Sequence, residues 1–239
     1  MPYRSDSSDS SDSDNDGESQ MIHLSDRMSN LFVVSEFDGD GRDFLPEGSL
    51  DSVMTRDNIL QELESKDGSG KKNNDIVKFI LEHPYAKKIF AIIVSLDCRE
   101  PRKMMKSLMS GAEKQGLDDR CLPIDDPRSP DTGERHTLRL SSLGKSWTET
   151  FIGRFYREQW RFLAPVFTVA TEDHKAHQDF KAPCIMSFTK RYDDEENLSK
   201  GAFGQVNKCK IHPDHLIDPA NPVSESLYVS VGVSCDMMS

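Results

Sequence analysis

Apolar residues in the middle of the chain recur every three or four positions, which is the spacing of one helix face. Ile59, Leu60 and Leu63 follow Thr55, a residue that suits the N-cap of an α-helix. A second run of the same kind predicts another helix, which opens at Asp75. The polar, glycine-containing stretch 66–74 between the two runs predicts a loop.

Two further helices are predicted beyond Pro84, which we expect to break or kink the chain. The first has apolar residues at the i, i+3, i+4 and i+7 positions of a buried stripe, namely Ala86, Ile89, Phe90 and Ile93. Pro101 is a favourable first residue for the second helix, and Gly116 is expected to end it.

Aromatic residues are concentrated in the last predicted helix, at about 147–163. They include Trp147, Phe151, Phe155, Tyr156, Trp160 and Phe162. Side chains of this size are either buried or used to dock a partner, and we interpret them as core. Residues 51–167 are therefore predicted to form a small helical domain of four or five helices, long enough to bury a core of its own.

The N-terminal residues 1–50 are predicted to be an acidic, Ser/Asp-rich tail and a linker. Residues 1–20 contain six acidic residues and one arginine, a local charge of -5, and almost nothing apolar. Such a segment buries too little surface to offset its ordering entropy, so we expect it to be disordered. Its serines precede acidic residues and would suit acidophilic kinases. A solubilising tail and a phosphorylated regulatory tail both stay open.

Two short features follow this tail. Residues 31–35 predict a short strand or an apolar linear element. The acidic stretch that starts at Asp38 suggests an EF-hand calcium loop. That loop needs an oxygen ligand, a glycine and a glutamate where this chain has Arg42, Asp43 and Ser49. We therefore interpret the stretch as an acidic turn.

Composition narrows the functional classes. The chain has 239 residues, of which 36% are hydrophobic and 30% charged, and its net charge is -11. No run of about 18 apolar residues occurs, so we expect no membrane span and no membrane partner. The first residues lack the apolar segment of a secretory signal. The negative charge argues against general nucleic-acid binding, although it does not exclude a local basic patch.

The five cysteines indicate the compartment. Their number is odd, their spacing is irregular and no CxxC occurs, so neither a disulfide framework nor a four-cysteine zinc site is expected. A reducing compartment, the cytoplasm or the nucleus, is the interpretation. We expect a protein partner or a protein substrate, and the sequence leaves the oligomeric state open.

The sequence changes character after a polar linker at 168–182, whose His174 and His177 we interpret as solvated. In the C-terminal segment 183–239, nine consecutive residues predict a strand, a tight turn and a second strand of a partial antiparallel β segment. They are Leu198, Ser199, Lys200, Gly201, Ala202, Phe203, Gly204, Gln205 and Val206. The two glycines let the backbone turn tightly, and the free N–H groups of such a turn can meet phosphate oxygens. On these residues alone an ordinary hairpin is the alternative.

The same nine residues resemble the glycine-rich loop of protein kinases, L-G-x-G-x-F-G-x-V, with Ser199 in place of the first glycine. The segment 155–167 resembles a region upstream of the kinase domain in fungal serine/threonine protein kinase-like proteins. The resemblance spans about 50–231 and implies that 183–239 is the truncated start of a kinase N-lobe. It implies ATP and Mg²⁺ as cofactors, phosphoryl transfer to protein serine or threonine, and residues 198–206 as the nucleotide-binding residues.

The catalytic groups of that family are missing from this sequence. A kinase holds the α- and β-phosphates with a lysine on its third strand, which here would be 227–232, with Val231 at the position of the lysine. No lysine follows Lys210, and neither an HRD nor a DFG motif occurs. We therefore assign no catalytic residue and expect the chain alone to be inactive. A natural short product and an incomplete gene model both stay open.

One cluster suggests a metal. Cys209, His212 and His215 follow a C-x2-H-x2-H spacing, and all three side chains can bind zinc. The spacing is tight for a tetrahedral site and no fourth ligand is evident. We interpret the segment as a polar loop and assign no metal site.

Two functions stay open. The first is the N-terminal part of a serine/threonine protein kinase, with ATP affinity on the order of millimolar or weaker because the glycine-rich loop lacks a partner lobe. The second is a protein-interaction module built on the helical domain 51–167, with binding tuned by the acidic tail.

Overall fold

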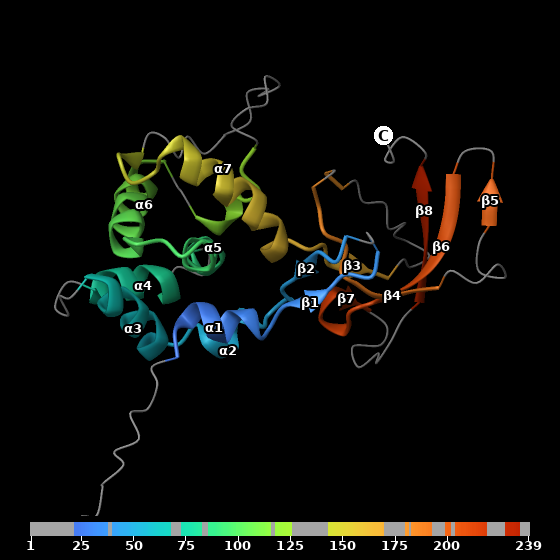
Figure 1. The fold of residues 1–239 in the computed structure, drawn as a ribbon, viewed down its shortest axis with the longest axis horizontal. Helices are drawn as coiled ribbons and strands as arrows, with labels where there is room; N and C mark the ends of the chain where they lie inside the picture. Colours follow the sequence, from blue (N-terminus) through green and yellow to red (C-terminus); the bar gives the residue numbers. More distant parts are fainter. Residues whose placement is uncertain are drawn as a thin grey trace, which may run out of the picture.

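The computed structural model describes residues 22–37, 40–67, 73–82, 86–115, 118–125, 143–169, 180–181, 183–192, 199–201, 204–218 and 228–234. Within these ranges the chain forms seven α-helices and eight short strands, with most of the strands in the C-terminal part. The predicted mainly α fold is therefore confirmed. Figure 1 shows the helices at one end of the molecule and the largest sheet at the other. No helix in these ranges is long and apolar enough to cross a membrane.

The helices from Arg56 onward begin close to where local signals predict them. They are α1 (Leu24–Ser29), α2 (Leu50–Val53), α3 (Arg56–Asp67), α4 (Asn74–Glu82), α5 (Lys87–Ser95), α6 (Pro101–Gln115) and α7 (Glu149–Glu158). The Thr55 hydroxyl accepts a hydrogen bond from the Asn58 N–H at 3.3 Å, as expected of an N-cap. Pro101 is the first residue of α6, as predicted. The helix predicted to open at Asp75 begins one residue earlier.

Helix α5 lies at the centre of the helical core. One buried stripe is predicted for it, but every residue from Ile89 to Val94 is at most 1% exposed. The reason is that α1, α4, α6 and α7 all pack against it. Its first amides are capped from a distance, because the Asp119 carboxylate accepts hydrogen bonds from the Lys88 and Ile89 N–H groups at 2.9 Å each. The predicted break at Pro84 lies outside the described residues, as does the predicted helix end at Gly116.

The aromatic segment is divided into two helical pieces. Trp147 precedes α7, whose N-cap Thr148 accepts a hydrogen bond from the Phe151 N–H at 3.2 Å. After α7 the chain tightens into the 3-10 helix η4 (Gln159–Phe162). The prediction of one helix over 147–163 is therefore wrong in its extent. The interpretation of the aromatic residues as core is confirmed for Trp147, Phe155, Trp160 and Phe162, each at most 6% exposed.

Part of the N-terminal segment assigned above to a tail and linker is ordered. Helix α1 buries Leu24 and Met28 in the helical core, at 2% and 1% exposure. A hairpin of β1 (Val33–Val34) and β2 (Asp43–Phe44) follows, which confirms the short strand expected near 31–35. Two apolar residues on one face are too weak a pattern to reveal a six-residue helix in advance. Residues 1–21 lie outside the described ranges.

The largest sheet is centred on β6 (Gly204–Ile211). Strand β8 (Tyr228–Ser234) pairs along one edge of β6, and β4 (Phe188–Tyr192) and β5 (Ser199–Gly201) pair with successive parts of it. All of these pairs are antiparallel. A separate parallel pair joins β3 (Phe167–Thr168) to β7 (Leu216–Ile217).

The N-terminal hairpin connects the helices to the sheet, and Figure 1 shows it between them. The Ser35 hydroxyl donates to the Met186 carbonyl at 2.7 Å, and the Glu36 N–H donates to the Phe188 carbonyl at 2.9 Å. Beside these bonds, Phe37 and Phe188 pack edge to face with ring centroids 5.3 Å apart. Hydrogen bonds and an aromatic contact therefore join residues 35–37, which follow β1, to the beginning of β4.

Candidate functional site

The predicted glycine-rich segment forms an antiparallel hairpin. In the register of β5 and β6, Ser199 lies opposite Val206, Lys200 opposite Gln205, and Gly201 opposite Gly204. The glycines therefore close a connection of two residues, a length typical of tight hairpins. The two predicted strands are confirmed as β5 (Ser199–Gly201) and the start of β6. Leu198, Ala202 and Phe203 lie outside the described residues.

The third strand expected at 227–232 is present as β8, but it carries no cation. Val231, at the position where the kinase resemblance places lysine, lies opposite Asn207. Gly232 lies opposite Val206, at the end of the glycine-rich segment. The strand next to the hairpin therefore has the expected place and direction and lacks the group that would hold phosphates.

Basic residues do gather on the other half of β6. Lys190 lies opposite Lys210, and Tyr192 lies opposite Lys208, on the paired strands β4 and β6. The Lys190 ammonium lies 4.7 Å from the centroid of the Tyr192 ring, and that of Lys208 lies 5.7 Å from it. Alternation along strands places these four side chains on one face of the sheet. These side chains form a small basic face beside the hairpin. None of them stands at the third-strand position where a kinase has its phosphate-binding lysine.

The C-x2-H-x2-H cluster has a structural role in the fold. His215 is completely buried. Its Nε2 accepts a hydrogen bond from the Glu47 N–H at 3.0 Å, and its Nδ1 lies 2.9 Å from the Pro165 carbonyl oxygen, to which it donates. Both ring nitrogens are therefore engaged by backbone and neither is available to a metal. No cluster of three or more metal-ligating side chains occurs among the residues that the structure describes.

Burial keeps both histidines of the cluster neutral. Burial lowers the pKa of His215, and the hydrogen bond to the Pro165 carbonyl only partly opposes this effect. Burial also lowers the pKa of His212, against the opposing charge of Asp214. His212 caps the 3-10 turn η6 (Pro213–His215) by accepting from the Asp214 N–H at 3.3 Å. His215 therefore connects three chain segments through its two hydrogen bonds and has a structural role.

The acidic stretch near Asp38 is likewise used in packing. Asp43 binds Arg161 through two hydrogen bonds of 2.5 and 2.6 Å, and Glu158 binds the same guanidinium at 2.7 Å. Although burial opposes the charge of Arg161, these carboxylates raise its pKa above the usual value. Asp38 itself lies outside the described residues, as do His174 and His177.

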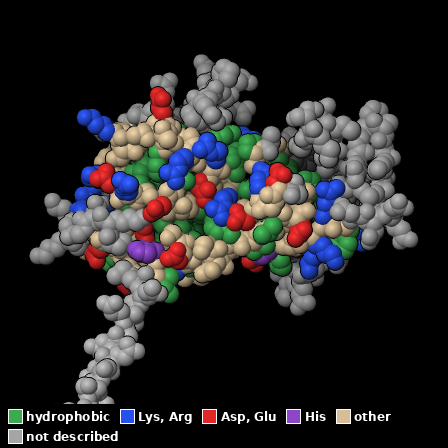
Figure 2. Space-filling model, in the orientation of Figure 1, with side chains coloured by type: hydrophobic (Ala, Val, Ile, Leu, Met, Phe, Trp, Pro, Cys, Tyr) green, Lys and Arg blue, Asp and Glu red, His purple; other side chains and the backbone are tan. Residues whose placement is uncertain are grey.

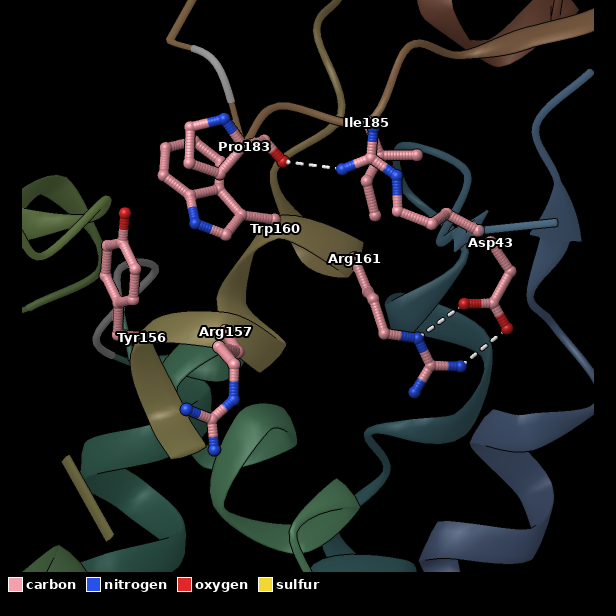
Figure 3. A pocket seen from close by; sticks show the side chains of 8 residues that line it. Asp43, Tyr156, Arg157, Trp160, Arg161, Pro183 and Ile185 are labelled. Atoms are coloured by element: carbon pink, nitrogen blue, oxygen red, sulfur yellow. Dashed lines mark hydrogen bonds and ion pairs between the residues drawn. The ribbon is translucent and has the colours of Figure 1, made fainter. Parts of the chain in front are cut away.

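An open pocket of about 360 Å³ lies where η4, β2 and the segment before β4 meet. Figure 3 shows the side chains that line it, which are Arg42, Asp43, Tyr156, Arg157, Trp160, Arg161, Pro183 and Ile185. Three of the eight are arginines, in a chain whose net charge is -11. Figure 2 shows acidic and basic side chains interspersed over one face of the molecule, without a large area of a single charge.

This pocket is the candidate binding feature that sequence reasoning missed. Its lining comes from three separate stretches, 42–43, 156–161 and 183–185, and only the fold brings them together. The one available signal was the density of aromatic residues in 147–163, which is compatible with docking as well as with a core.

Comparisons with known proteins add no relatives. No family model matches the chain, and neither the curated proteins nor the solved structures include one that is significantly similar to it.

Proposed function

We propose that the C-terminal part of this chain is the nucleotide-binding start of a serine/threonine kinase-like lobe. The observation that carries the proposal is the β5–β6 hairpin, which closes between Gly201 and Gly204 and has β8 as an antiparallel neighbour. A glycine-rich hairpin followed by a third strand is the first element that a kinase uses to cover ATP. The proposed ligand is therefore ATP with Mg²⁺, held by the backbone of residues 198–206.

The proposed chemistry stops at binding in the sequence printed here. Phosphoryl transfer depends on positioning and charge stabilisation, which require the third-strand lysine, an aspartate base and a metal-binding aspartate. Val231 occupies the position of that lysine. The chain alone is expected to bind ATP with a Kd on the order of millimolar or weaker and to transfer no phosphate. Transfer to a protein serine or threonine would require the motifs that this sequence lacks.

The first experiment is the intact mass of the endogenous protein together with the 3′ end of its transcript. A product that continues into a lysine strand, HRD and DFG supports the proposal. A product that ends at Ser239 restricts it to nucleotide binding by this chain, which a second experiment tests.

The second experiment places the missing charge on the full chain. Val231→Lys is expected to strengthen MgATP binding about tenfold, equivalent to ~1.4 kcal/mol, because the lysine would meet phosphate oxygens under the hairpin. Ile217→Lys, at an exposed strand position 53% accessible to solvent, is the charge-matched control and should leave binding unchanged. Equal effects of the two variants, or no effect of Val231→Lys, would contradict the proposed role of the hairpin.

A second candidate function is a protein-interaction module, and the pocket beside η4 favours it. The pocket is open, partly apolar and basic, and none of its lining belongs to the glycine-rich hairpin. Such a site suits an acidic protein segment, so the proposed partner is a protein rather than nucleic acid or a membrane. The cytoplasm or nucleus stays the predicted compartment. Loss of one defined partner from the full chain on Arg157→Gln, with retention on Lys145→Gln, would support this function.

A further inference from the structure

Two side chains that line the pocket, Trp160 and Arg157, donate no hydrogen bond to the described residues. Trp160 is only 6% exposed to solvent, and its buried Nε1–H group has no hydrogen-bond acceptor. Figure 3 shows this nitrogen on the side of the indole ring that faces Tyr156 and Arg157. Arg157 is exposed, and none of the described side chains forms an ion pair or hydrogen bond with it. A buried N–H without an acceptor costs about 1–3 kcal/mol, so an acceptor that enters the pocket is favoured.

Arg161 and Asp43, two other charged residues of the lining, are already paired. Arg161 is held by Asp43 and Glu158, and its guanidinium carbon lies 3.9 Å from the centroid of the Phe32 ring. Figure 3 shows Arg161 turned toward Asp43 rather than toward Trp160. Arg161 therefore lines the pocket with its guanidinium already bound to Asp43 and Glu158. The two open donors define a ligand that is rich in acceptors and negatively charged.

We propose that this pocket binds the acidic N-terminal segment of the same chain, residues 1–20. That segment has six carboxylates and one arginine, a net charge of -5, whereas the pocket is lined by three arginines and one carboxylate. Its serine hydroxyls and carboxylates supply the acceptors that Arg157 and Trp160 require. The proposal does not depend on the glycine-rich hairpin. It extends the second candidate function, because a docked segment would compete with any acidic protein partner.

The segment is long enough to reach the pocket. From Ile22 to Phe32 the chain runs through α1, so these residues are within roughly 22 Å of each other. Phe32 contacts Arg161, which lines the pocket. Twenty residues extend to about 65 Å, nearly three times that span.

The linkage also explains how weak contacts suffice. An exposed ion pair contributes only about 0.2–1 kcal/mol. Attachment to the same chain raises the effective concentration of the segment to the millimolar range, so several such contacts populate the docked state. The interaction is expected to weaken with salt, because the charges at the pocket rim are within reach of solvent ions.

The test uses the full chain labelled with 5-fluorotryptophan and observed by ¹⁹F NMR. The chain has two tryptophans, Trp160 in the pocket and Trp147 in the helical core, so one reports on docking and the other is an internal reference. Replacing all six acids of residues 1–20 by Asn or Gln is expected to shift the Trp160 resonance and leave that of Trp147 unchanged. Arg157→Gln should reproduce the shift, and so should salt at about 1 M, where the Debye length is ~3 Å.

Lys145→Gln is the matched control, because it removes one exposed positive charge outside the pocket and should move neither resonance. An unchanged Trp160 resonance in the chain with the neutral segment would overturn the proposal. Phenyl phosphate, added to the unmodified chain, distinguishes an external ligand. If phenyl phosphate shifts the Trp160 resonance equally in the unmodified chain and in the chain with the neutral segment, residues 1–20 do not compete for the pocket and are not its occupant.

Discussion

Replacing His215 tests whether one buried side chain holds the helices and the sheet together. His215→Ala removes the acceptor of the Glu47 N–H and the donor to the Pro165 carbonyl, two backbone groups from different segments. An unsatisfied buried polar group costs about 1–3 kcal/mol. The substitution also removes an edge-to-face contact with Phe44, whose ring centroid is 5.2 Å away. Together these losses predict a destabilisation of about 3–5 kcal/mol.

The pH dependence of stability gives this prediction a specific signature. The pKa of His215 is lowered by burial, so the unfolded state takes up its proton first as the pH falls below the ordinary value of 6.5. The free energy of unfolding is therefore constant above that pH and decreases below it, by at most about 1.4 kcal/mol per pH unit for this group. The decrease ends once the pH is below the pKa of the folded state.

Two assays separate His215 from its neighbours. Urea denaturation between pH 5 and 8 is measured on His212→Asn, which keeps a cap for the Asp214 N–H and removes the neighbouring imidazole ring. The slope below pH 6.5 should become smaller when His215→Ala is added, because the contribution of this one group is lost. Hydrogen exchange of the Glu47 amide should lose its protection in His215→Ala. A loss of less than about 1 kcal/mol with an unchanged pH slope would refute the assigned role.

Three further substitutions test local features by urea denaturation. Asp119→Ala should cost about 1–2 kcal/mol, because the two carboxylate oxygens of Asp119 cap the Lys88 and Ile89 N–H groups at the start of α5; Asp119→Asn, which keeps one acceptor oxygen, should recover only part of the loss, and an Asp119→Ala variant as stable as the parent chain would contradict capping. Leu63→Ala should cost about 2–5 kcal/mol because Leu63 is fully buried, and the half-buried Leu60 should cost less on the same change. Arg161→Lys should cost no more than about 1 kcal/mol, because the side chains of Arg161 and Asp43 are both about 30% exposed and an ion pair in contact with solvent contributes little; a larger loss would contradict this small contribution.

The sequence was sufficient to predict those elements whose stabilising contacts are between residues close together in the chain. Thr55 caps α3 through an atom three residues away, and Pro101 starts α6 because its ring suits a first helical position. Gly201 and Gly204 close a hairpin for the same local reason. Helix α5 was predicted from its spacing, although its burial on every side was not, because that depends on four other helices.

The candidate site shows the opposite dependence. The pocket joins stretches more than 100 residues apart, and the ion pair between Asp43 and Arg161 is one of its walls. The spacing around His215 and in the stretch beginning at Asp38 resembles that of metal ligands, although no metal site was predicted at either place. In the fold His215 satisfies backbone groups of two distant segments, and Asp43, from the same acidic stretch, neutralises Arg161. A spacing pattern identifies which groups a segment can offer, but it does not say which groups it meets.

The printed sequence is therefore enough for the helices from α3 onward, the Thr55 cap, the two strands of the glycine hairpin and the absence of a lysine after Lys210, because each depends on residue type within a few positions. Contacts over long separations decided the rest. Burial of α1, the cap that Asp119 supplies to α5, the neutral state of His215 and the basic pocket beside η4 all exist only once the chain is folded. Their physical cause is shared: burial and pairing set the energy of a polar group, and both are properties of neighbours in space.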